Sequence, residues 1–223
     1  MGTLKQFLPL DGVPILARTL LALSKGRAVQ SLVVVVPPGE EAQGVELIHR
    51  FRVPVEAEVV GGGAERQESV YLGLQRAKPI ADLVVIHDGV RPFVSQELLQ
   101  ACLREAEAWG AAVAAIPVKE TIKEVDEEGL ILRTPERRRL WVAQTPQVFR
   151  YDLIVEAHRR AREEEFVGTD DAALVERLGV KVKVVLGSPD NIKITTPEDL
   201  LLAEQLVKQT QFKVQGSRGD VGS

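Results

Sequence analysis

The amino-acid sequence predicts a doubly wound α/β fold built on a mostly parallel β-sheet. Short apolar runs alternate along the chain with amphipathic stretches of helical period. Continuous β-branched runs such as Ser31–Pro37 are typical of strands that are covered on both faces. Because strands and helices alternate, right-handed crossovers between parallel strands are expected. A polar segment at residues 118–138 interrupts this alternation and predicts a projecting hairpin arm.

The individual elements follow from the same patterns. The predicted strands, in chain order, are Ser31–Pro37, Val55–Val60, Leu83–His87, Ala111–Ile116 and Val180–Leu186. The first two predicted helices are Val13–Leu23 and Glu65–Ala77. Ser95, Thr169 and Thr196 are each expected to cap a further helix, because a hydroxyl at the N-cap accepts a bond from a free backbone N–H.

The arm reads as two short strands, Thr121–Val125 and Leu130–Thr134, that are joined by a turn. It contains too few apolar residues to form a core of its own, so we expect it to need a partner surface. We expect residues 1–210 to form one domain that includes the arm at about 118–138. The polar residues 211–223 are expected to form a disordered tail.

Composition excludes several classes of protein. The chain has 223 residues, a net charge of −4 and one cysteine. The charge gives no reason to expect nucleic-acid or membrane binding, and one cysteine excludes an intrachain disulfide. No apolar run is long enough to span a membrane and no secretory segment is apparent, so a cytoplasmic location is expected. The sequence has no dinucleotide-binding fingerprint, which disfavours a dehydrogenase. It also has no P-loop, no zinc-type Cys/His cluster and no Ser-His-Asp pattern.

The loops that follow the strands carry the chemically informative residues, because ligands of α/β sheets bind at the carboxyl ends of strands. In the run HDGVRP, Asp88 can hold a divalent metal and Arg91 can bind phosphate or orient Asp88. A purely structural Asp–Arg pair is an equally good interpretation. In GGGAER, the glycines allow close approach to a ligand and the helix N-terminus offers N–H donors, although a tight turn explains the run as well.

Other polar residues are ambiguous on spacing alone. Lys193 can hold a phosphate as a point charge, but an exposed strand lysine is the simpler interpretation. The hydroxyl of Ser69 can reach a base or ribose, but an ordinary helical serine is the commoner interpretation. Spacing does not distinguish Lys5 from a surface lysine. The basic run Arg137–Arg139 can form a phosphate site, but a solvated run of charges is more usual. His49 and His158 have no ligand-spaced partners and are interpreted as structural or surface residues.

Taken together, these segments resemble the 2-C-methyl-D-erythritol 4-phosphate cytidylyltransferases of the non-mevalonate isoprenoid pathway. The resemblance extends from Gly2 to about Leu206 through KQFLPLDGVPIL, GGGAERQESV, VIHDGVRPFV, AAIPVKETIKEV, LWVAQTPQVF, TDDAALVERLG and DNIKITTPEDL. It implies a Rossmann-like domain, Mg²⁺ or another divalent cation, CTP and a sugar-alcohol phosphate as substrates, and a homodimer formed through the arm. Ribitol-5-phosphate cytidylyltransferases resemble the same family and differ in the acceptor.

The resemblance also implies a role for each matching residue. Lys5 would stabilise the transition state, and Asp88 and Arg91 would serve the metal and the nucleotide. Contacts to cytosine and ribose would come from Gly62, Gly63 and Ser69. Thr121 and Arg137 of the arm, together with Lys193, would bind the methylerythritol phosphate, with Arg137 and Lys193 also counted as catalytic.

The start of the sequence departs from the family pattern. Members normally begin with a strand and a glycine-rich loop of the type AAGxGxRMG before the KQF segment. Here Gly2 aligns with the end of that loop, and the resemblance implies that it contacts the nucleotide. We therefore expect a strand and a triphosphate-binding loop to precede the printed sequence. Without that strand, neighbouring strands should have an unpaired edge. If the loop is truly absent, a non-catalytic nucleotide-binding protein is the alternative.

Overall fold

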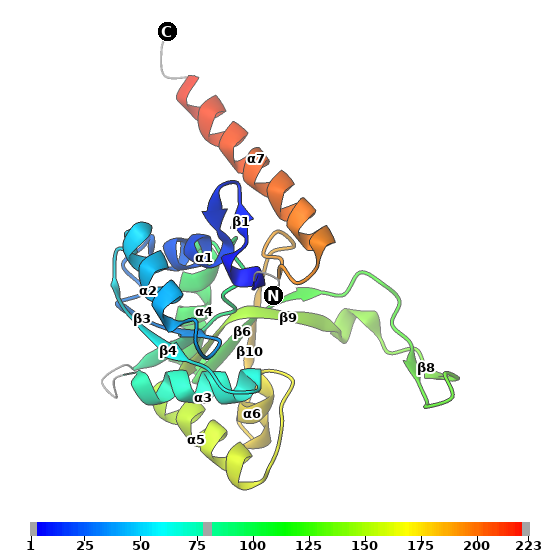
Figure 1. Cartoon of the computed structure of the whole chain (residues 1–223). Coiled ribbons are helices and arrows are strands. Elements are labelled where there is room, and N and C mark those ends of the chain that lie inside the picture. Colours follow the sequence, from blue (N-terminus) through cyan, green and yellow to red (C-terminus); the bar gives the residue numbers. More distant parts are fainter. Residues whose placement is uncertain (1–3, 78–81, 220–223) are drawn as a thin grey trace. The chain divides into compact units, whose positions relative to one another are not determined.

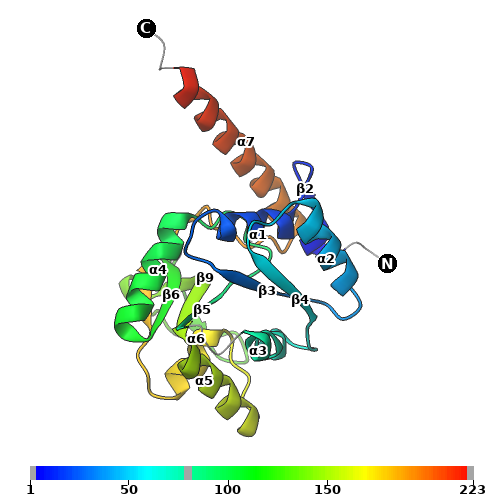
Figure 2. The same ribbon diagram turned by 90° about the vertical axis from the view of Figure 1, so that its left-hand side faces the viewer.

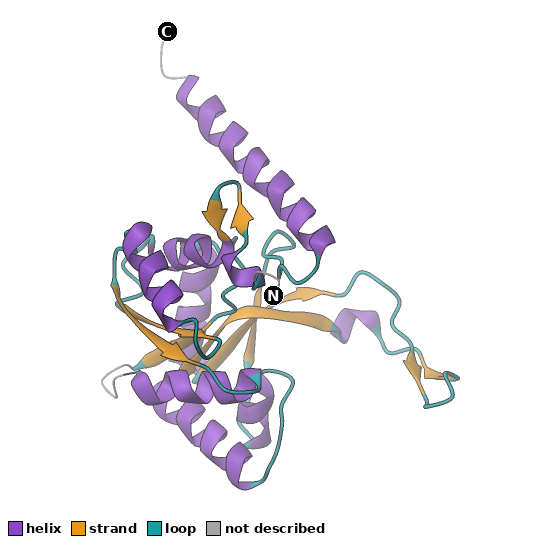
Figure 3. Cartoon of the chain, in the orientation of Figure 1, coloured by secondary structure: helices purple, strands orange, loops and turns teal. Residues whose placement is uncertain are grey.

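The computed structural model describes residues 4–77 and 82–219, with side chains as far as residue 209. The chain forms two compact units. The first comprises Met1–Ala81, His87–Gln100 and Asp190–Ser223, and the second comprises Asp82–Ile86 and Ala101–Pro189. Both contain helices and strands, which confirms the α/β class (Figure 3).

The first unit is built around two parallel strands. Strand β3 (Ser31–Val36) pairs in parallel with β4 (Glu56–Gly61). Helices α1 (Ile15–Ser24) and α2 (Glu41–Arg50) cover one face of this pair, and α3 (Arg66–Arg76) covers the other (Figure 2). The alternating valines of β3 therefore have apolar partners on both faces, as the continuous apolar run predicted.

Packing on the two faces of β3 follows the alternation of its side chains. Val34 and Val36 are buried in a cluster with Leu16 and Leu20 of α1 and Leu47 of α2. On the other face, Gly73 of α3 lies so close that an added Cβ would be 3.0 Å from Val35. A glycine at this position therefore lets α3 approach the strand closely.

A second cluster in the first unit joins the segments that carry the candidate site. Strands β1 (Pro9–Leu10) and β2 (Val13–Pro14) form a hairpin after the 3-10 helix η1 (Lys5–Phe7). The buried residues of this cluster are Leu10, Ile15, Val90, Ile194, Ala203 and Val207. Val90 lies in the HDGVRP loop, and Ile194 directly follows Lys193 in the DNIKIT run (residues 190–195, called the NIK segment below). The last two residues belong to helix α7 (Pro197–Gly219). These two loops are thus held by one apolar core.

The second unit contains a four-stranded mixed sheet in the order β10-β6-β9-β5. Its strands are β5 (Leu83–Ile86), β6 (Ala111–Pro117), β9 (Trp141–Arg150) and β10 (Lys183–Leu186). Strand β10 is parallel to β6, whereas β9 is antiparallel to both of its neighbours. β9 was not predicted, and it makes this sheet mixed, although β5, β6 and β10 run in the same direction. Pro146 lies within β9, and a proline argues against a central strand on sequence grounds.

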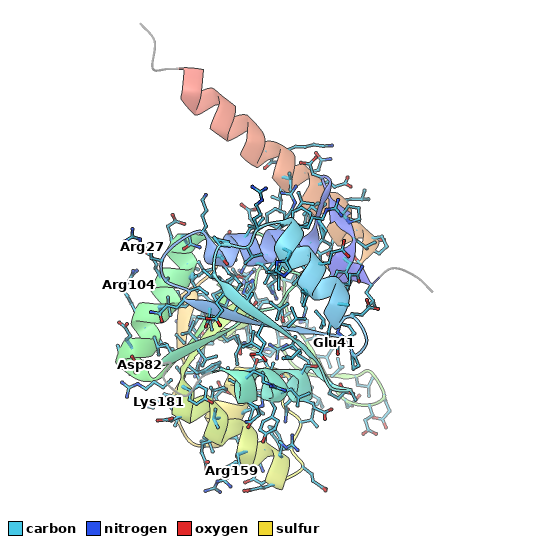
Figure 4. The ribbon with its side chains drawn as sticks, turned by 60° about the vertical axis from the view of Figure 1, so that its left-hand side comes forward. Arg27, Glu41, Asp82, Arg104, Arg159 and Lys181 are labelled. Atoms are coloured by element: carbon cyan, nitrogen blue, oxygen red, sulfur yellow. The ribbon has the colours of Figure 1, made fainter. Side chains whose placement is uncertain are left out.

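Helices complete the second unit. Helix α4 (Gln96–Trp109) begins in the first unit and leads to β6, and α5 (Tyr151–Glu163) and α6 (Asp171–Arg177) follow β9. Arg159 forms ion pairs with Glu156 and Glu163 on the exposed side of α5 (Figure 4).

The arm projects from the ends of β6 and β9 as a hairpin (Figure 1). Its strands, β7 (Glu124–Val125) and β8 (Ile131–Arg133), are shorter than predicted, and the 3-10 helix η2 (Arg137–Arg139) follows them. At the turn, the backbone N–H of Leu130 donates to Oδ1 of Asp126 at 2.8 Å. The hairpin prediction is confirmed.

The helix caps agree with the sequence analysis at two positions of three. Oγ of Ser95 accepts from the N–H of Leu98 at 3.1 Å, and Thr196 accepts from the N–H of Asp199 at 3.3 Å. In α6 the cap is Asp170 rather than Thr169, because the carboxylate accepts from the N–H of Ala173 at 2.9 Å.

Several further expectations can be compared with the structure. Helix α7 continues to Gly219, over residues that were expected to form a disordered tail, because extending a formed helix costs little free energy. Residues 220–223 lie outside the described residues.

His158 is fully buried against Asp171, as a structural histidine. In the described part of the chain, β3 pairs with β4 and β5 pairs with β9. None of the described helices combines the length and apolar character needed to cross a membrane.

Candidate functional site

Asp88 is the centre of a cluster of ion pairs in the first unit. Its Oδ2 lies 3.1 Å from Nε of Arg91 and 3.3 Å from Nζ of Lys193, and its Oδ1 lies 3.4 Å from Nε of Arg66. The side chains of Asp88 and Arg91 are 10% and 11% exposed, whereas those of Arg66 and Lys193 are 38% and 39% exposed. One carboxylate with three cations leaves an excess of positive charge, which suits an anionic ligand.

Two loops are fastened together to make this cluster. The N–H of Arg91 donates to the carbonyl of Asp88 at 3.1 Å, which closes the turn after β5. Nη1 of Arg91 donates to the carbonyl of Asn191 at 2.8 Å, and the N–H of Ile194 donates to the carbonyl of Val90 at 2.9 Å. Lys193 therefore lies beside Asp88, because the residues that flank it, Asn191 and Ile194, are both hydrogen-bonded to the HDGVRP loop.

The electrostatics of the cluster favour a charged Asp88. Burial alone would raise the pKa of this carboxyl, but the charges of Lys193, Arg66 and Arg91 outweigh it and lower the pKa below the usual 3.8. Burial also lowers the pKa of His87 to about 4. His87 is therefore neutral at pH 7, and its Nε2 lies 3.1 Å from the carbonyl of Arg91, to which it can donate.

The glycine-rich loop after β4 is held by β3 and by contacts of its own segment. The N–H of Gly62 donates to the carbonyl of Val36 at 2.7 Å. The N–H of Gly63 donates to Oγ of Ser69 at 3.1 Å, and the N–H of Ala64 donates to Oε2 of Glu68 at 2.9 Å. An added Cβ at Gly62 would lie 2.6 Å from Oγ of Ser69. The glycines thus let Ser69 approach the backbone closely, and the N–H donors of Gly63 and Ala64, which were expected to face a ligand, are engaged by Ser69 and Glu68.

The remaining predicted site residues lie apart from the cluster or outside the first unit. Lys5 begins η1 and is exposed. Thr121 and Arg137 are exposed residues of the arm in the second unit. Nη1 of Arg137 donates to the carbonyl of Lys119 at 2.9 Å, at the base of the arm. Gly2 lies outside the described residues.

Sequence reasoning missed Arg66, although it lies in the GGGAER run. One signal was available, because Arg66 occupies the first turn of α3. A basic residue is unfavourable at a helix N-terminus, where the partial charge is positive. A residue placed against this preference is a candidate for function.

A separate groove of about 590 Å³ is lined by residues of β4 and α3 that include Glu58 and Arg76, together with Glu41. Glu41 lies at the start of α2 (Figure 4). None of its lining residues belongs to the Asp88 cluster. We therefore assign the chemistry to the cluster and not to this groove.

Asp88 is the candidate metal ligand in this cluster. In the described ranges, no group of three or more His, Cys, Asp or Glu side chains is suited to hold a metal ion. A single carboxylate nevertheless fits Mg²⁺, which phosphate-transfer sites bind through one or two carboxylates together with substrate phosphates. The residues present are thus compatible with a cation that the substrate helps to hold.

Comparison with known proteins identifies one family. The family model described as 2-C-methyl-D-erythritol 4-phosphate cytidylyltransferase matches residues 1–209. A relative of that name from Pelotomaculum thermopropionicum is 47% identical over 218 residues, which cover 97% of this chain and 92% of the relative.

Solved structures give the same result. The structure of 4-diphosphocytidyl-2C-methyl-D-erythritol synthase from Anaerococcus prevotii has a TM-score of 0.85 and 31% identity, and the match covers 91% of this chain and 93% of that one. The 2-C-methyl-D-erythritol 4-phosphate cytidylyltransferase of Thermus thermophilus has a TM-score of 0.78 and 37% identity, with 93% and 95% covered. The similarity therefore extends over nearly the full length of these proteins.

Proposed function

The chain belongs to the 2-C-methyl-D-erythritol 4-phosphate cytidylyltransferase family, and from this premise we propose that it transfers the cytidylyl group of CTP to 2-C-methyl-D-erythritol 4-phosphate. The products are 4-diphosphocytidyl-2-C-methyl-D-erythritol and pyrophosphate, in non-mevalonate isoprenoid biosynthesis. The observation that carries the proposal is the assembly of Asp88, Arg91, Lys193 and Arg66 from three separate segments into one cationic cluster.

The reaction needs positioning and charge neutralisation more than covalent chemistry. A phosphate oxygen of the acceptor attacks the α-phosphorus of CTP in line, a new P–O bond forms, and the bond to the β-phosphate breaks with its electrons leaving on pyrophosphate. Two polyanions must be brought together, so fixed cations are the appropriate groups. Lys193 would hold the acceptor phosphate, and Lys5 would neutralise charge that develops at the α-phosphate.

Asp88 would hold the divalent cation, for which we propose Mg²⁺. The bound cation would supply charge neutralisation at the nucleotide phosphates. Because both oxygens of Asp88 already face cationic side chains, binding requires Arg66 or Lys193 to turn toward substrate phosphate. Both side chains are more exposed than Arg91, which suits them to that movement.

The arm would form a homodimer with a second copy of the chain. Its apolar residues Val125, Leu130, Ile131 and Leu132 are between 50% and 67% exposed. Burying such residues against a partner is favourable, since large exposed apolar surfaces often mark interaction sites. Thr121 and Arg137 would then contribute to acceptor binding from the arm. Because both substrates are water-soluble phosphates, we place the reaction in the cytoplasm.

The choice of acceptor tests this function. We expect pyrophosphate release when the protein is given CTP, Mg²⁺ and 2-C-methyl-D-erythritol 4-phosphate, with a kcat/KM at least about a hundredfold higher than with ribitol 5-phosphate. A preference for ribitol 5-phosphate would reassign the acceptor. Release with neither acceptor would contradict cytidylyl transfer by this protein.

A further inference from the structure

The three cations around Asp88 differ in burial and bonding, and this difference indicates separate roles. We propose that Arg66 is the guanidinium that binds the phosphates of the nucleotide, whereas Arg91 is a positioning residue that holds Asp88 and the Lys193 loop in place. The inference rests on the proposed function, since it assigns parts of that site.

Arg91 has the surroundings of a framework residue. Its side chain is 11% exposed, and both ends of its guanidinium are engaged: Nε with Oδ2 of Asp88 at 3.1 Å, and Nη1 with the carbonyl of Asn191 at 2.8 Å. These bonds join the two loops that carry Asp88 and Lys193. Turning Arg91 toward a ligand would break both bonds and remove the cation nearest to Asp88. The role of Arg91 is therefore to hold the two loops in position.

Arg66 is more exposed than Arg91. Its side chain is 38% exposed, and its Nε lies 3.4 Å from Oδ1 of Asp88, which is a long contact. A contact of this length and exposure contributes little to stability. A phosphate offers several oxygens in a geometry that matches the guanidinium fork, so exchanging Asp88 for a phosphate is favourable.

The position of Arg66 in α3 supports a ligand rather than a structural role. Its charge opposes the positive end of the helix dipole, and an anion at this place would remove that penalty. The backbone donors nearby do not serve an anion in this state, because Glu68 binds the N–H of Ala64 and Ser69 binds the N–H of Gly63. Between Gly61 and Ser69, Arg66 is the one basic residue in the sequence.

The two sides of Asp88 indicate which substrate Arg66 serves. Arg66 approaches Oδ1, whereas Arg91 and Lys193 approach Oδ2. Arg66 also lies within one turn of Ser69, which is expected to contact the ribose. The phosphate next to the ribose is the α-phosphate, so Arg66 belongs to the nucleotide and Lys193 remains for the acceptor.

A set of variants of the full chain tests this division. Calorimetric titration with CTP and with cytidine should show that Arg66→Gln weakens CTP binding by about tenfold or more while cytidine binding stays unchanged, because cytidine lacks the phosphates. The KM for the acceptor should change by less than about twofold, and the melting temperature should not fall. Arg76→Gln, an exposed arginine of the same helix that pairs with Glu58 at 3.7 Å, is the matched control and should leave every value unchanged.

Arg91→Lys should lower the melting temperature and reduce kcat/KM for both substrates to a similar extent, because its effect passes through Asp88 and Lys193. Unchanged CTP affinity in Arg66→Gln, or a selective loss of CTP affinity in Arg91→Lys without loss of stability, would overturn the assignment. The proposed function and the proposed role of Arg66 can each fail without the other. An Arg66-dependent CTP affinity without transfer activity would contradict the proposed function alone, and an active enzyme indifferent to Arg66→Gln would contradict this inference alone.

Discussion

At the scale of single residues, Asp88 combines burial with charge. Its side chain is 10% exposed, and burial of a carboxylate is costly unless cations compensate it. Lys193, Arg66 and Arg91 provide that compensation and lower the pKa of Asp88. The carboxylate is thus ionised at pH 7, which is the state that the proposed cation site requires.

Asp199 makes a prediction possible about the helix that follows the NIK segment. Its Oδ2 accepts from the N–H of Thr195 at 2.8 Å, the N–H of Thr196 at 2.9 Å and the hydroxyl of Thr195 at 2.9 Å. These bonds, that of the Thr195 N–H foremost, lower the pKa of Asp199 from 3.8. Because the folded pKa lies below the unfolded one, the stabilisation is fully present above pH 3.8 and is lost as the pH falls through the lower folded value.

We expect Asp199→Ala to lower the free energy of unfolding by about 1 kcal/mol at pH 7, as for other lost caps, and the gap to the wild type to narrow below about pH 3.8. Urea unfolding at several pH values measures both effects. Glu198→Ala, an acidic neighbour in the same turn, is the control and should cost less than half as much. If the difference in free energy of unfolding between the wild type and Asp199→Ala stays constant down to pH 2, the ionised carboxylate of Asp199 is not the source of the stabilisation.

The role of a residue was predictable where it belongs to a local sequence motif. It was not predictable where only the folded chain brings the residue to the site. Asp88 and Arg91 were singled out from the HDGVRP loop, and they are paired. Lys193 resembled an exposed strand lysine on spacing alone, because its distance of 3.3 Å to Asp88 depends on bonds between loops about a hundred residues apart. The one sequence signal for Arg66 is its place at the N-terminus of α3, where a positive charge is unfavourable.

At the scale of elements, strands with a continuous apolar pattern were predicted well and β9 was missed. β3 and β6 begin at the predicted residues, Ser31 and Ala111. β9 combines a proline with the polar residues Gln144, Thr145 and Gln147, all of them buried. Its place between β6 and β5 comes from long-range pairing that no local pattern reveals.

The arm provides a prediction at the same scale. Leu130 is 67% exposed at the tip of the hairpin, and Leu201 on α7 is 64% exposed. If the arm forms the dimer, Leu130→Glu should convert the dimer to a monomer, because a charge in an apolar interface is costly, whereas Leu201→Glu should leave the dimer intact. Sedimentation velocity distinguishes the two states.

A monomeric wild-type chain would contradict the arm-mediated dimer. So would equal dissociation by the two variants, because it would show a general effect of surface charge rather than a specific interface.

At the scale of the whole molecule, the family and the fold agree over nearly the full chain. The family model matches residues 1–209, and the structure from Anaerococcus prevotii has a TM-score of 0.85. Composition could exclude classes such as disulfide scaffolds but could not indicate a substrate. The substrate follows from the family together with a cationic cluster, since the cluster by itself would suit many phosphorylated ligands.

The most direct test of the central claim is to observe the new phosphorus–oxygen bond by ³¹P NMR. With CTP, Mg²⁺ and 2-C-methyl-D-erythritol 4-phosphate, we expect the acceptor monophosphate signal to be replaced by the two coupled signals of a diphosphate diester, with one pyrophosphate released for each. Asp88→Asn should slow this conversion by about a hundredfold or more, because it removes the charge that the cluster is built around. Pyrophosphate and CMP appearing with the acceptor unchanged, or conversion that is unaffected in Asp88→Asn, would contradict the account.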